Sequence, residues 1–279
     1  MNRIQNIPEI SEYGLGTTGF WSGANPGLAD CISEAVDRFG LSTVDTAEMY
    51  GGGRCEEALG RVISEMGRDS FFLVDKILPE HADDKGFRKS LQASLARLGT
   101  DYIDLYLLHW RENADLSFLV PAMESAVRDG LILHWGVSNF DTPDLEDLLA
   151  VENGDRCYCN QIFYNIYERV CEHHLLPFMK EHHILPMSYS SLGSGYYPHP
   201  DIRRNHPVMK LCRDAGVTPE TMMLRWNVKH GFCALFSTSS VVHLRDNLQT
   251  VPDEVFGQFE RIIDREFPLP AHSYPLVKI

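Results

Sequence analysis

Short apolar segments alternate with amphipathic segments of helical length along most of the chain. FFLVDK, from Phe71 to Lys76, is an apolar run with the length of a strand. The segment GFRKSLQASLARLG then carries apolar residues three and four positions apart and ends in glycine, which predicts an amphipathic helix. The same alternation predicts strands at residues 13–17, 41–47, 71–76, 102–110, 131–138, 157–163, 184–189 and 233–238. It predicts helices at residues 28–39, 55–66, 86–99, 116–130, 142–154, 168–183 and 218–231, and a final helix from about Val241.

The predicted strands are too continuously apolar to leave one face of a sheet in water. Strands of this kind, each followed by a helix, form a parallel sheet covered by helices, so the fold class is α/β. Closure into a (β/α)8 TIM barrel is the simplest arrangement of eight such units, and an open doubly wound sheet is the alternative. Because no linker or change of composition interrupts the pattern, we expect one domain over residues 1–279.

Composition narrows the class of protein. The 279 residues are 44% hydrophobic and 23% charged, as in ordinary globular proteins, and no apolar run approaches the ~18 residues of a membrane span. The opening segment, MNRIQNIPEISEYG, lacks the basic and apolar regions of a secretory signal, and seven scattered cysteines fit a reducing compartment. We therefore expect a cytoplasmic protein that does not bind membranes. A formal charge of −14 also argues against nucleic acid as a partner.

Four ionisable residues lie at the ends of three consecutive predicted strands or in the loops that follow. Asp45 ends one strand and Tyr50 lies in the next loop, while Lys76 and His109 end the two strands after it. Barrel enzymes carry their catalytic residues at this end of the strands, which lie about 4.8 Å apart. Each residue alone has an ordinary explanation, as a cap, a surface aromatic, a solvated strand end or a core histidine. Together at one end of a barrel they indicate a catalytic site.

This set of side chains has a definite chemistry. The Lys76 ammonium favours the phenolate of Tyr50 and so brings the phenol proton within reach of transfer. Asp45 would keep Lys76 charged, and His109 would hold a substrate oxygen by a hydrogen bond. Such a site protonates an oxygen that is becoming an alkoxide, but no side chain supplies a hydride. A nicotinamide cofactor supplies one, and the protein then aligns it with a carbonyl group.

The segments around these residues resemble the signature segments of the aldo-keto reductase family, in that family's order, from about Tyr13 to Asn247. The matching segments are GLGTTGF, VDTAEMYGGGRCEEALG, SLARLGTDYIDLYLLHW, GVSNF, NQIFYN, LLPF, MSYSSLGSG and TPETMMLRW. The resemblance implies a TIM barrel and an NAD(P)H-dependent oxidoreductase that reduces an aldehyde or ketone to the alcohol. It also implies a catalytic tetrad, with Tyr50 as the general acid. The tetrad residues are Asp45, Tyr50, Lys76 and His109.

The resemblance further implies where the cofactor binds. Ser138, Asn139 and Gln161 match residues that hold the nicotinamide carboxamide, and Tyr189 matches a ring stacked on the nicotinamide. A planar ring prefers an offset aromatic partner, which agrees with that role. The other implied positions are Thr17 and Thr18 near the ribose, Ser190, Leu192 and Ser194 along the pyrophosphate, and Ser237, Thr238, His243 and Asn247 after the last strand.

One departure from the family pattern bears on cofactor choice. Family members that prefer NADPH usually place basic residues after the last strand and in the next helix, where this chain has Ser237 and His243, with Asp246 close by. Fewer positive charges weaken charge-assisted hydrogen bonds to the 2′-phosphate, although Arg245 and nearby serines offset part of the loss. We therefore expect NADP(H) as the main cofactor, NAD(H) as an accepted one, and weak discrimination between them.

Other segments carry less specific signals. Phe20, Trp21 and Trp110 are candidates for an apolar substrate wall, and ordinary core packing explains them equally well. The loop GSGYYPHPDIRRNHP is either a strap over the cofactor, with Arg203 and Arg204 facing phosphate, or a solvated basic turn.

Two motifs are set aside. GLGTTG matches the dinucleotide fingerprint in letters only, because FWSGANPG separates it from the next helix. The histidine pairs at 173–174 and 182–183 lack a recognised metal-ligand spacing, so we expect no metal. The alternative function is a nicotinamide-binding sensor or partner subunit with little or no turnover, as the related potassium-channel beta subunits imply for this fold.

Overall fold

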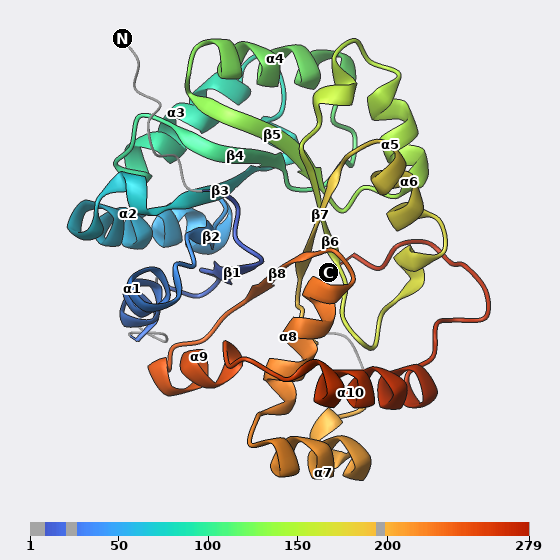
Figure 1. The fold of residues 1–279 in the computed structure, drawn as a ribbon. Coiled ribbons are helices and arrows are strands. Elements are labelled where there is room, and N and C mark those ends of the chain that lie inside the picture. Colours follow the sequence, from blue (N-terminus) through green and yellow to red (C-terminus); the bar gives the residue numbers. More distant parts are fainter. Residues whose placement is uncertain (1–8, 21–26, 194–198, 279) are drawn as a thin grey trace.

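Eight parallel strands close into a barrel in the order β1 to β8, and β8 pairs with β1 (Figure 1). The computed structural model describes residues 9–20, 27–193 and 199–278. The strands are β1 (Tyr13–Gly16), β2 (Thr43–Asp45), β3 (Phe72–Ile77), β4 (Ile103–Leu108), β5 (Ile132–Ser138), β6 (Cys159–Phe163), β7 (Leu185–Tyr189) and β8 (Cys233–Phe236). The predicted (β/α)8 TIM barrel is confirmed.

Helices surround this barrel on the outside (Figure 1). The α-helices are α1 (Leu28–Phe39), α2 (Arg54–Met66), α3 (Phe87–Leu98), α4 (Leu116–Arg128), α5 (Thr142–Leu149), α6 (Leu175–Glu181), α7 (His206–Ala215), α8 (Pro219–Lys229), α9 (Val241–Asn247) and α10 (Asp253–Glu266). Short 3-10 helices lie in the loops between these elements, among them η1 (Tyr50–Gly53), η5 (Val170–Glu172) and η6 (Ile202–Arg204).

Apolar side chains fill two layers, because successive residues of a strand point to opposite faces. On β3, Val74 belongs to the cluster inside the barrel, whereas Leu73 and Ile77 pack against the surrounding helices. The same alternation directs Lys76 into the barrel and Asp75 away from it. The cluster inside the barrel consists of Phe72, Val74, Leu105, Leu107, Cys159, Met187, Cys233 and Leu235.

Three predicted helices end or divide differently from the expectation. The helix predicted over 168–183 is divided into η5 and α6. The helix predicted over 142–154 stops at Leu149, and the Asp141 side chain caps its start. The final helix predicted from Val241 is two helices, since Pro252 interrupts the pattern before α10 begins. Helix α7 was not predicted.

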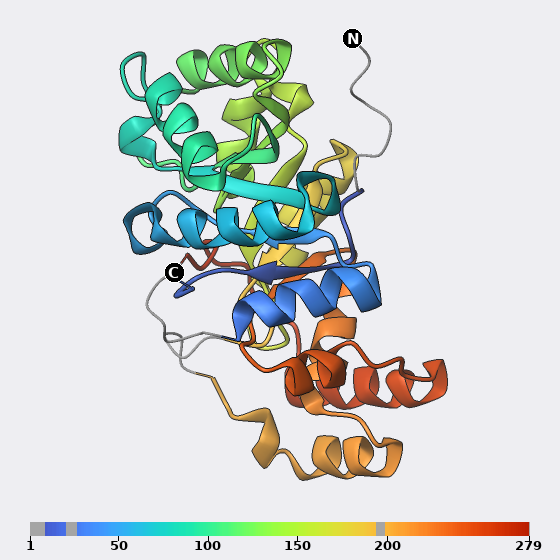
Figure 2. The same ribbon diagram turned by 90° about the vertical axis from the view of Figure 1, so that its left-hand side faces the viewer.

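The carboxyl ends of the strands share one side of the barrel, and the C-terminal segment of the chain reaches the same side (Figure 2). Leu276 is buried there, and its backbone N–H donates a hydrogen bond to the Asp141 carboxylate, just beyond β5, at 3.0 Å. No helix within the described residues is long and apolar enough to span a bilayer.

All seven cysteines are buried and free of disulfides. Burial raises the pKa of Cys31 and Cys212 to about 11 and that of Cys157 to about 12. The pKa values of Cys159, Cys171 and Cys233 are raised by burial as well. The chain therefore carries thiols that are shielded from solvent and resist ionisation.

Candidate active site

The four ionisable residues at the strand ends come together at the carboxyl end of the barrel. Lys76 is fully buried, and its Nζ atom is 2.7 Å from each carboxylate oxygen of Asp45. The same ammonium donates to the carbonyl oxygen of Thr46 at 2.9 Å and to the Tyr50 hydroxyl at 3.3 Å. The rings of Tyr50 and His109 are 5.8 Å apart and meet edge to face at 79°.

The register of the barrel strands and a run of glycines bring Asp45, Lys76 and Tyr50 close together. Asp45 pairs with Val74 across β2 and β3, and Lys76 lies two residues further along β3 on the same inward face. The three glycines at 51–53 have φ angles of 61°, 64° and 88°, a left-handed backbone that other residues rarely adopt. The chain can therefore turn directly after Tyr50 and enter α2.

Burial and the ion pair act in opposite directions on the ionisable groups. Burial alone would lower the pKa of Lys76, but Asp45 and Tyr50 raise it above its ordinary value, so the ammonium stays charged. Burial raises the pKa of Tyr50, and the Lys76 charge lowers it only in part. The sequence pattern pointed to the lowering effect of Lys76 alone, whereas in the fold burial raises the pKa of Tyr50 more than Lys76 lowers it. The environment therefore favours the neutral phenol.

His109 is a neutral imidazole in this site. Burial, and after it the charge of Lys76, lowers the pKa of His109 to about 3. Within the described residues, the His109 Nδ1 atom is buried without a hydrogen-bond partner. The Trp110 ring lies 4.8 Å from the imidazole, tilted by 53°.

Two of the residues expected to hold a nicotinamide are joined to each other and to the loop of His109. The Tyr189 hydroxyl donates to the side-chain oxygen of Asn139 at 2.7 Å. The Asn139 amide donates in turn to the carbonyl oxygen of His109 at 3.1 Å. Asn139 has a φ of 61°, so these two hydrogen bonds hold a backbone conformation that few residue types accept.

Gln161, also expected to hold the carboxamide, contacts Asp45 inside the barrel. Its side-chain amide turns into the barrel, where Nε2 is 2.9 Å from the Asp45 carboxylate and 3.0 Å from the Met187 sulfur. Its backbone oxygen accepts a hydrogen bond from the Ser138 hydroxyl at 2.8 Å. Asp45 thus has a second side-chain donor besides Lys76.

Comparison with known proteins identifies the family. The model of the Aldo/keto reductase family matches residues 13–264. The chain belongs to this family. Methylglyoxal reductase YeaE of Escherichia coli (strain K12) is 32% identical to this aldo-keto reductase over 232 residues, which cover 83% of the chain and 81% of the relative.

Solved structures agree with this assignment. The crystal structure of an aldo/keto reductase from Klebsiella pneumoniae, in complex with NADP and acetate, matches with a TM-score of 0.89 and 32% identity over 97% of this chain and 96% of that one. A second crystal structure of an aldo-keto reductase from Klebsiella pneumoniae, in complex with NADPH, has a TM-score of 0.85 and 31% identity over 99% of both chains. The family resemblance seen in the sequence is confirmed, and the protein is an oxidoreductase of the aldo-keto reductase type.

The positions expected near the cofactor ribose lie beside Asp45 and Tyr50. Thr17 is fully buried, and its backbone N–H donates to the carbonyl oxygen of Asp45 at 2.9 Å. The Thr17 hydroxyl has no hydrogen-bond partner within the described part of the chain. Thr18 is exposed and forms a hydrogen bond with Tyr50 that slightly lowers the pKa of the phenol.

The positions expected along the pyrophosphate are described in part. Ser190 follows β7 with a φ of 54°, and Leu192 is half-buried against the core. Ser194 lies outside the described residues.

The segment after β8 carries no free cation at the positions compared with the family. Ser237 and His243 are both exposed, and Asn247 is buried within α9. The Thr238 hydroxyl oxygen accepts the N–H of Ser240 at 3.2 Å. Arg245 was expected to compensate for missing charge, but it forms an ion pair with Glu34 at 2.7 Å.

The expected apolar wall is only partly described. Phe20 and Trp110 are half-buried, and Phe20 packs against the main core. Trp21 lies outside the described residues. Met49 was not predicted as part of this wall, and its side chain is 44% exposed directly before Tyr50. The sequence feature that could have identified Met49 is its place as an apolar residue in the loop that carries Tyr50.

Arg203 is paired in the structure rather than free to face phosphate. Its guanidinium contacts the Glu220 carboxylate and lies 3.6 Å from Asp201. Arg204 is exposed beside a groove of about 630 Å³ that Glu266 and His199 also line. For Arg203, the structure therefore favours the solvated basic turn over the cofactor strap.

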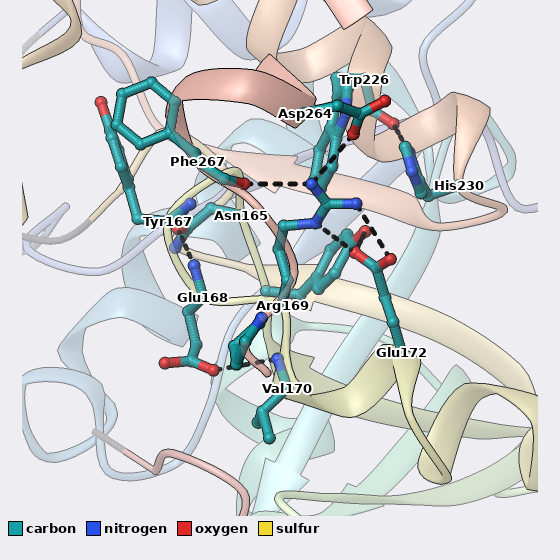
Figure 3. A network of polar contacts seen from close by, with 12 residues as sticks. Asn165, Tyr167, Glu168, Arg169, Val170, Glu172, Trp226, His230, Asp264 and Phe267 are labelled. Carbon is teal, nitrogen blue, oxygen red and sulfur yellow. Dashed lines mark hydrogen bonds and ion pairs between the residues drawn. The ribbon is translucent and has the colours of Figure 1, made fainter. Parts of the chain in front are cut away.

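The loop after β6 contains a buried arginine that the sequence analysis also missed (Figure 3). Arg169 donates to both carboxylate oxygens of Glu172, at 2.8 and 3.2 Å, and to Asp264 at 3.2 Å. It donates to the carbonyl oxygen of Phe267 at 3.1 Å, and its guanidinium lies 5.2 Å from the centre of the Trp226 ring. One side chain thus joins this loop to α8 and to the end of α10.

A second buried polar group lies between β3 and the helices outside it. Asp75 accepts a hydrogen bond from the backbone N–H of Lys76 at 2.8 Å, and its other oxygen has no partner within the described residues. Burial, and then the nearby Glu56, raises the pKa of Asp75 well above its ordinary value. Glu56 is itself paired with Arg97 at 2.7 Å. Of these two carboxyls, Asp75 has no compensating cation, and its surroundings favour the neutral form.

Proposed function

We propose that this aldo-keto reductase reduces a small aldehyde or ketone to the alcohol with NADPH, and that Tyr50 donates the proton. One observation carries the proposal. The Lys76 ammonium is held between the Asp45 carboxylate, at 2.7 Å, and the Tyr50 hydroxyl, at 3.3 Å. A phenol that gives up its proton beside a fixed positive charge leaves a stabilised phenolate.

Each residue of the tetrad has a separate part in the proposed reaction. Tyr50 holds a proton at its hydroxyl and transfers it to the carbonyl oxygen of the substrate. Lys76 offsets the negative charge that grows on the Tyr50 oxygen, and Asp45 keeps Lys76 charged inside the barrel. His109, neutral because its pKa is about 3, orients the carbonyl oxygen by donating a hydrogen bond from its ring.

The residues around the tetrad fit a nicotinamide cofactor, which supplies the hydride when bound. The buried Thr17 hydroxyl has no partner within the described residues, and a ribose hydroxyl would satisfy it. Ser138, Asn139 and Tyr189 would orient the nicotinamide ring by hydrogen bonds and stacking. Gln161 would join them through its side-chain oxygen, while its Nε2 atom stays on Asp45. The NADP and NADPH complexes of the two Klebsiella pneumoniae relatives support NADPH as the cofactor of this chain.

The relative named methylglyoxal reductase YeaE points to a small reactive aldehyde as substrate. Methylglyoxal is therefore the first compound to test. The Trp110 ring beside His109 and the exposed Met49 side chain beside Tyr50 would contact its methyl end. We also infer that the protein works in the cytoplasm, because seven free cysteines suit a reducing compartment.

Substitution of Tyr50 by phenylalanine tests the proposal. The change removes the acidic proton and keeps the ring, so we expect kcat for methylglyoxal to fall by about 10²- to 10⁴-fold, the usual contribution of a general acid. The dissociation constant of NADPH should change by less than about threefold, because the ring and the cofactor residues remain. Absorbance of NADPH follows turnover, and quenching of protein fluorescence follows binding.

Tyr102→Phe is the matched control. Tyr102 precedes β4 at the opposite end of the barrel, and its ring packs on Arg68, a contact that phenylalanine retains. This variant should behave as wild type. Wild-type turnover by Tyr50→Phe would reject Tyr50 as the proton donor, and NADPH binding without any turnover in the unmodified protein would favour the sensor alternative.

A further inference from the structure

The loop after β6 places one aromatic ring against two residues that follow β7. The Tyr167 ring stacks on His199, with ring centres 4.1 Å apart and planes inclined by only 13°. Gly193 is part of the same contact, because a Cβ atom at this position would be 2.7 Å from the His199 ring and 3.1 Å from the Tyr167 ring. Gly193 has a φ of 84°. Both residues therefore rest on a side chain that belongs to a different loop.

The same loop also holds the end of β7 by a polar contact. The Asn165 amide donates a hydrogen bond to the carbonyl oxygen of Ser190 at 3.1 Å. The Asn165 side-chain oxygen accepts the backbone N–H groups of Tyr167 and Glu168 at 2.9 and 3.2 Å. Asn165 thus fixes its own loop and the start of the segment after β7 together.

On its other side, the loop after β6 is held by polar and aromatic contacts (Figure 3). Arg169 connects it to Glu172, Asp264 and the carbonyl oxygen of Phe267. The Phe267 ring meets the Tyr167 ring edge to face, with centres 5.2 Å apart. The buried Glu168 carboxylate accepts the hydroxyl of Tyr274, from the C-terminal segment, at 2.9 and 3.0 Å.

We propose that Tyr167 is a positioning residue for the cofactor, which holds Ser190–Gly193 and His199 in the arrangement that receives the pyrophosphate. The inference rests on the proposed function, because Ser190 and Leu192 are assigned to the pyrophosphate by family resemblance. A bound cofactor leaves when the residues along its pyrophosphate move aside. The stack on Tyr167 opposes that movement, so Tyr167 sets the rate of cofactor release without touching the reacting atoms.

Two substitutions of Tyr167 separate the ring from its hydroxyl. Tyr167→Ala removes the stack, and we expect the dissociation rate of NADPH, measured by stopped-flow fluorescence, to rise about tenfold, as for the loss of a stacked aromatic pair. Tyr167→Phe keeps the ring and should stay within about threefold of wild type. The single-turnover rate of methylglyoxal reduction at saturating NADPH should be unchanged in both variants, because the tetrad is intact. A merely structural role would not spare that rate.

Tyr158→Ala is the matched control. Tyr158 precedes β6 at the opposite end of the barrel, and its ring stacks on His134 with centres 4.5 Å apart and planes inclined by 27°. Loss of this stack should leave NADPH dissociation unchanged. A similar increase in Tyr158→Ala would overturn the proposal, since it would show a general loosening of the barrel.

Gly193→Ala tests the same stack from its other side. The added methyl group would collide with the His199 ring, so this variant should also release NADPH faster. If Tyr167→Ala fails to fold, Gly193→Ala alone tests whether the stack controls NADPH release. Dissociation rates within about twofold of wild type in folded Tyr167→Ala or Gly193→Ala would overturn the inference while leaving the proposed function intact. Failure of the unmodified protein to bind NADPH would overturn both.

Discussion

Replacement of Lys76 by methionine removes the charge at the centre of the proposed mechanism. Methionine keeps much of the length of the lysine stem, so the inside of the barrel stays filled. Asp45 then has Gln161 as its only side-chain donor within the described residues, and Tyr50 has no ammonium beside it. We expect a folded protein with a much lower kcat.

The size of the effect follows from the 3.3 Å between the Lys76 nitrogen and the Tyr50 oxygen. Coulomb's law with an effective dielectric constant of about 20 gives an attraction of about 5 kcal/mol between unit charges at this distance. Tyr50 is half-buried, and its proton is only partly transferred in the transition state, so about half of this energy, ~2.5 kcal/mol, applies. That loss corresponds to a fall in kcat of about 70-fold, and the full energy to several thousandfold.

Single-turnover reduction of methylglyoxal by the NADPH complex measures this change without interference from product release. Thermal unfolding of the variant checks that it folds, and fluorescence titration checks that it binds NADPH. Lys89→Met, at an exposed position of α3, is the matched control and should react like wild type. A folded, NADPH-bound Lys76→Met variant whose rate lies within about fivefold of wild type would refute the electrostatic role of Lys76.

Three further predictions concern pH and cofactor choice. Because the pKa of His109 is lowered from 6.5 to about 3, the unfolded chain binds a proton there that the folded chain does not, and the free energy of unfolding should fall as pH falls through this window. His109→Gln should flatten that dependence in urea titrations, and an unchanged slope would contradict the assignment. The raised pKa of Asp75 has the opposite effect on stability. The free energy of unfolding should fall as pH rises above 3.8, the ordinary pKa of this carboxyl. Asp75→Asn, which keeps an acceptor for the N–H of Lys76, should therefore raise the melting temperature at about pH 8, and a lower melting temperature would argue against a protonated Asp75. With Ser237 and His243 exposed and Arg245 paired to Glu34, the dissociation constants of NADPH and NADH should differ by only about tenfold, and a ratio above about a hundredfold would count against this view.

Local sequence patterns predicted the barrel well because the strands are short continuous apolar runs and the helices carry apolar residues three and four positions apart. The helix predicted over 28–39 has the observed bounds, and seven of the eight strands shorten only at their ends, whereas β3 shifts by one residue and keeps its length. The helical period of α10 is visible in Phe256, Phe259 and Ile263, which are spaced by three and four, but the break at Pro252 that separates it from α9 was not predicted. That the whole chain is one domain stays a prediction.

The site was harder to predict where it depends on contacts between distant residues. The four tetrad positions follow strand ends, which local patterns locate. The contacts of Arg169 with Asp264 and Phe267 join residues 95 and 98 positions apart, and no periodicity reports such pairs. The raised pKa of Tyr50 was not predicted, for a similar reason. The burial that raises it exists only in the folded chain, whereas the sequence pattern showed the neighbouring lysine alone.

The burial of all seven cysteines has a practical consequence for studying motion in this protein. A thiol-specific dye reacts with exposed thiolates, whereas all seven native thiols are covered and burial raises the pKa of six of them. A single cysteine added on the surface would then be the preferred attachment point without prior removal of the natural ones. A fluorophore placed at the exposed Pro200 in this way would report directly, in real time, how the surroundings of His199 respond to nucleotide.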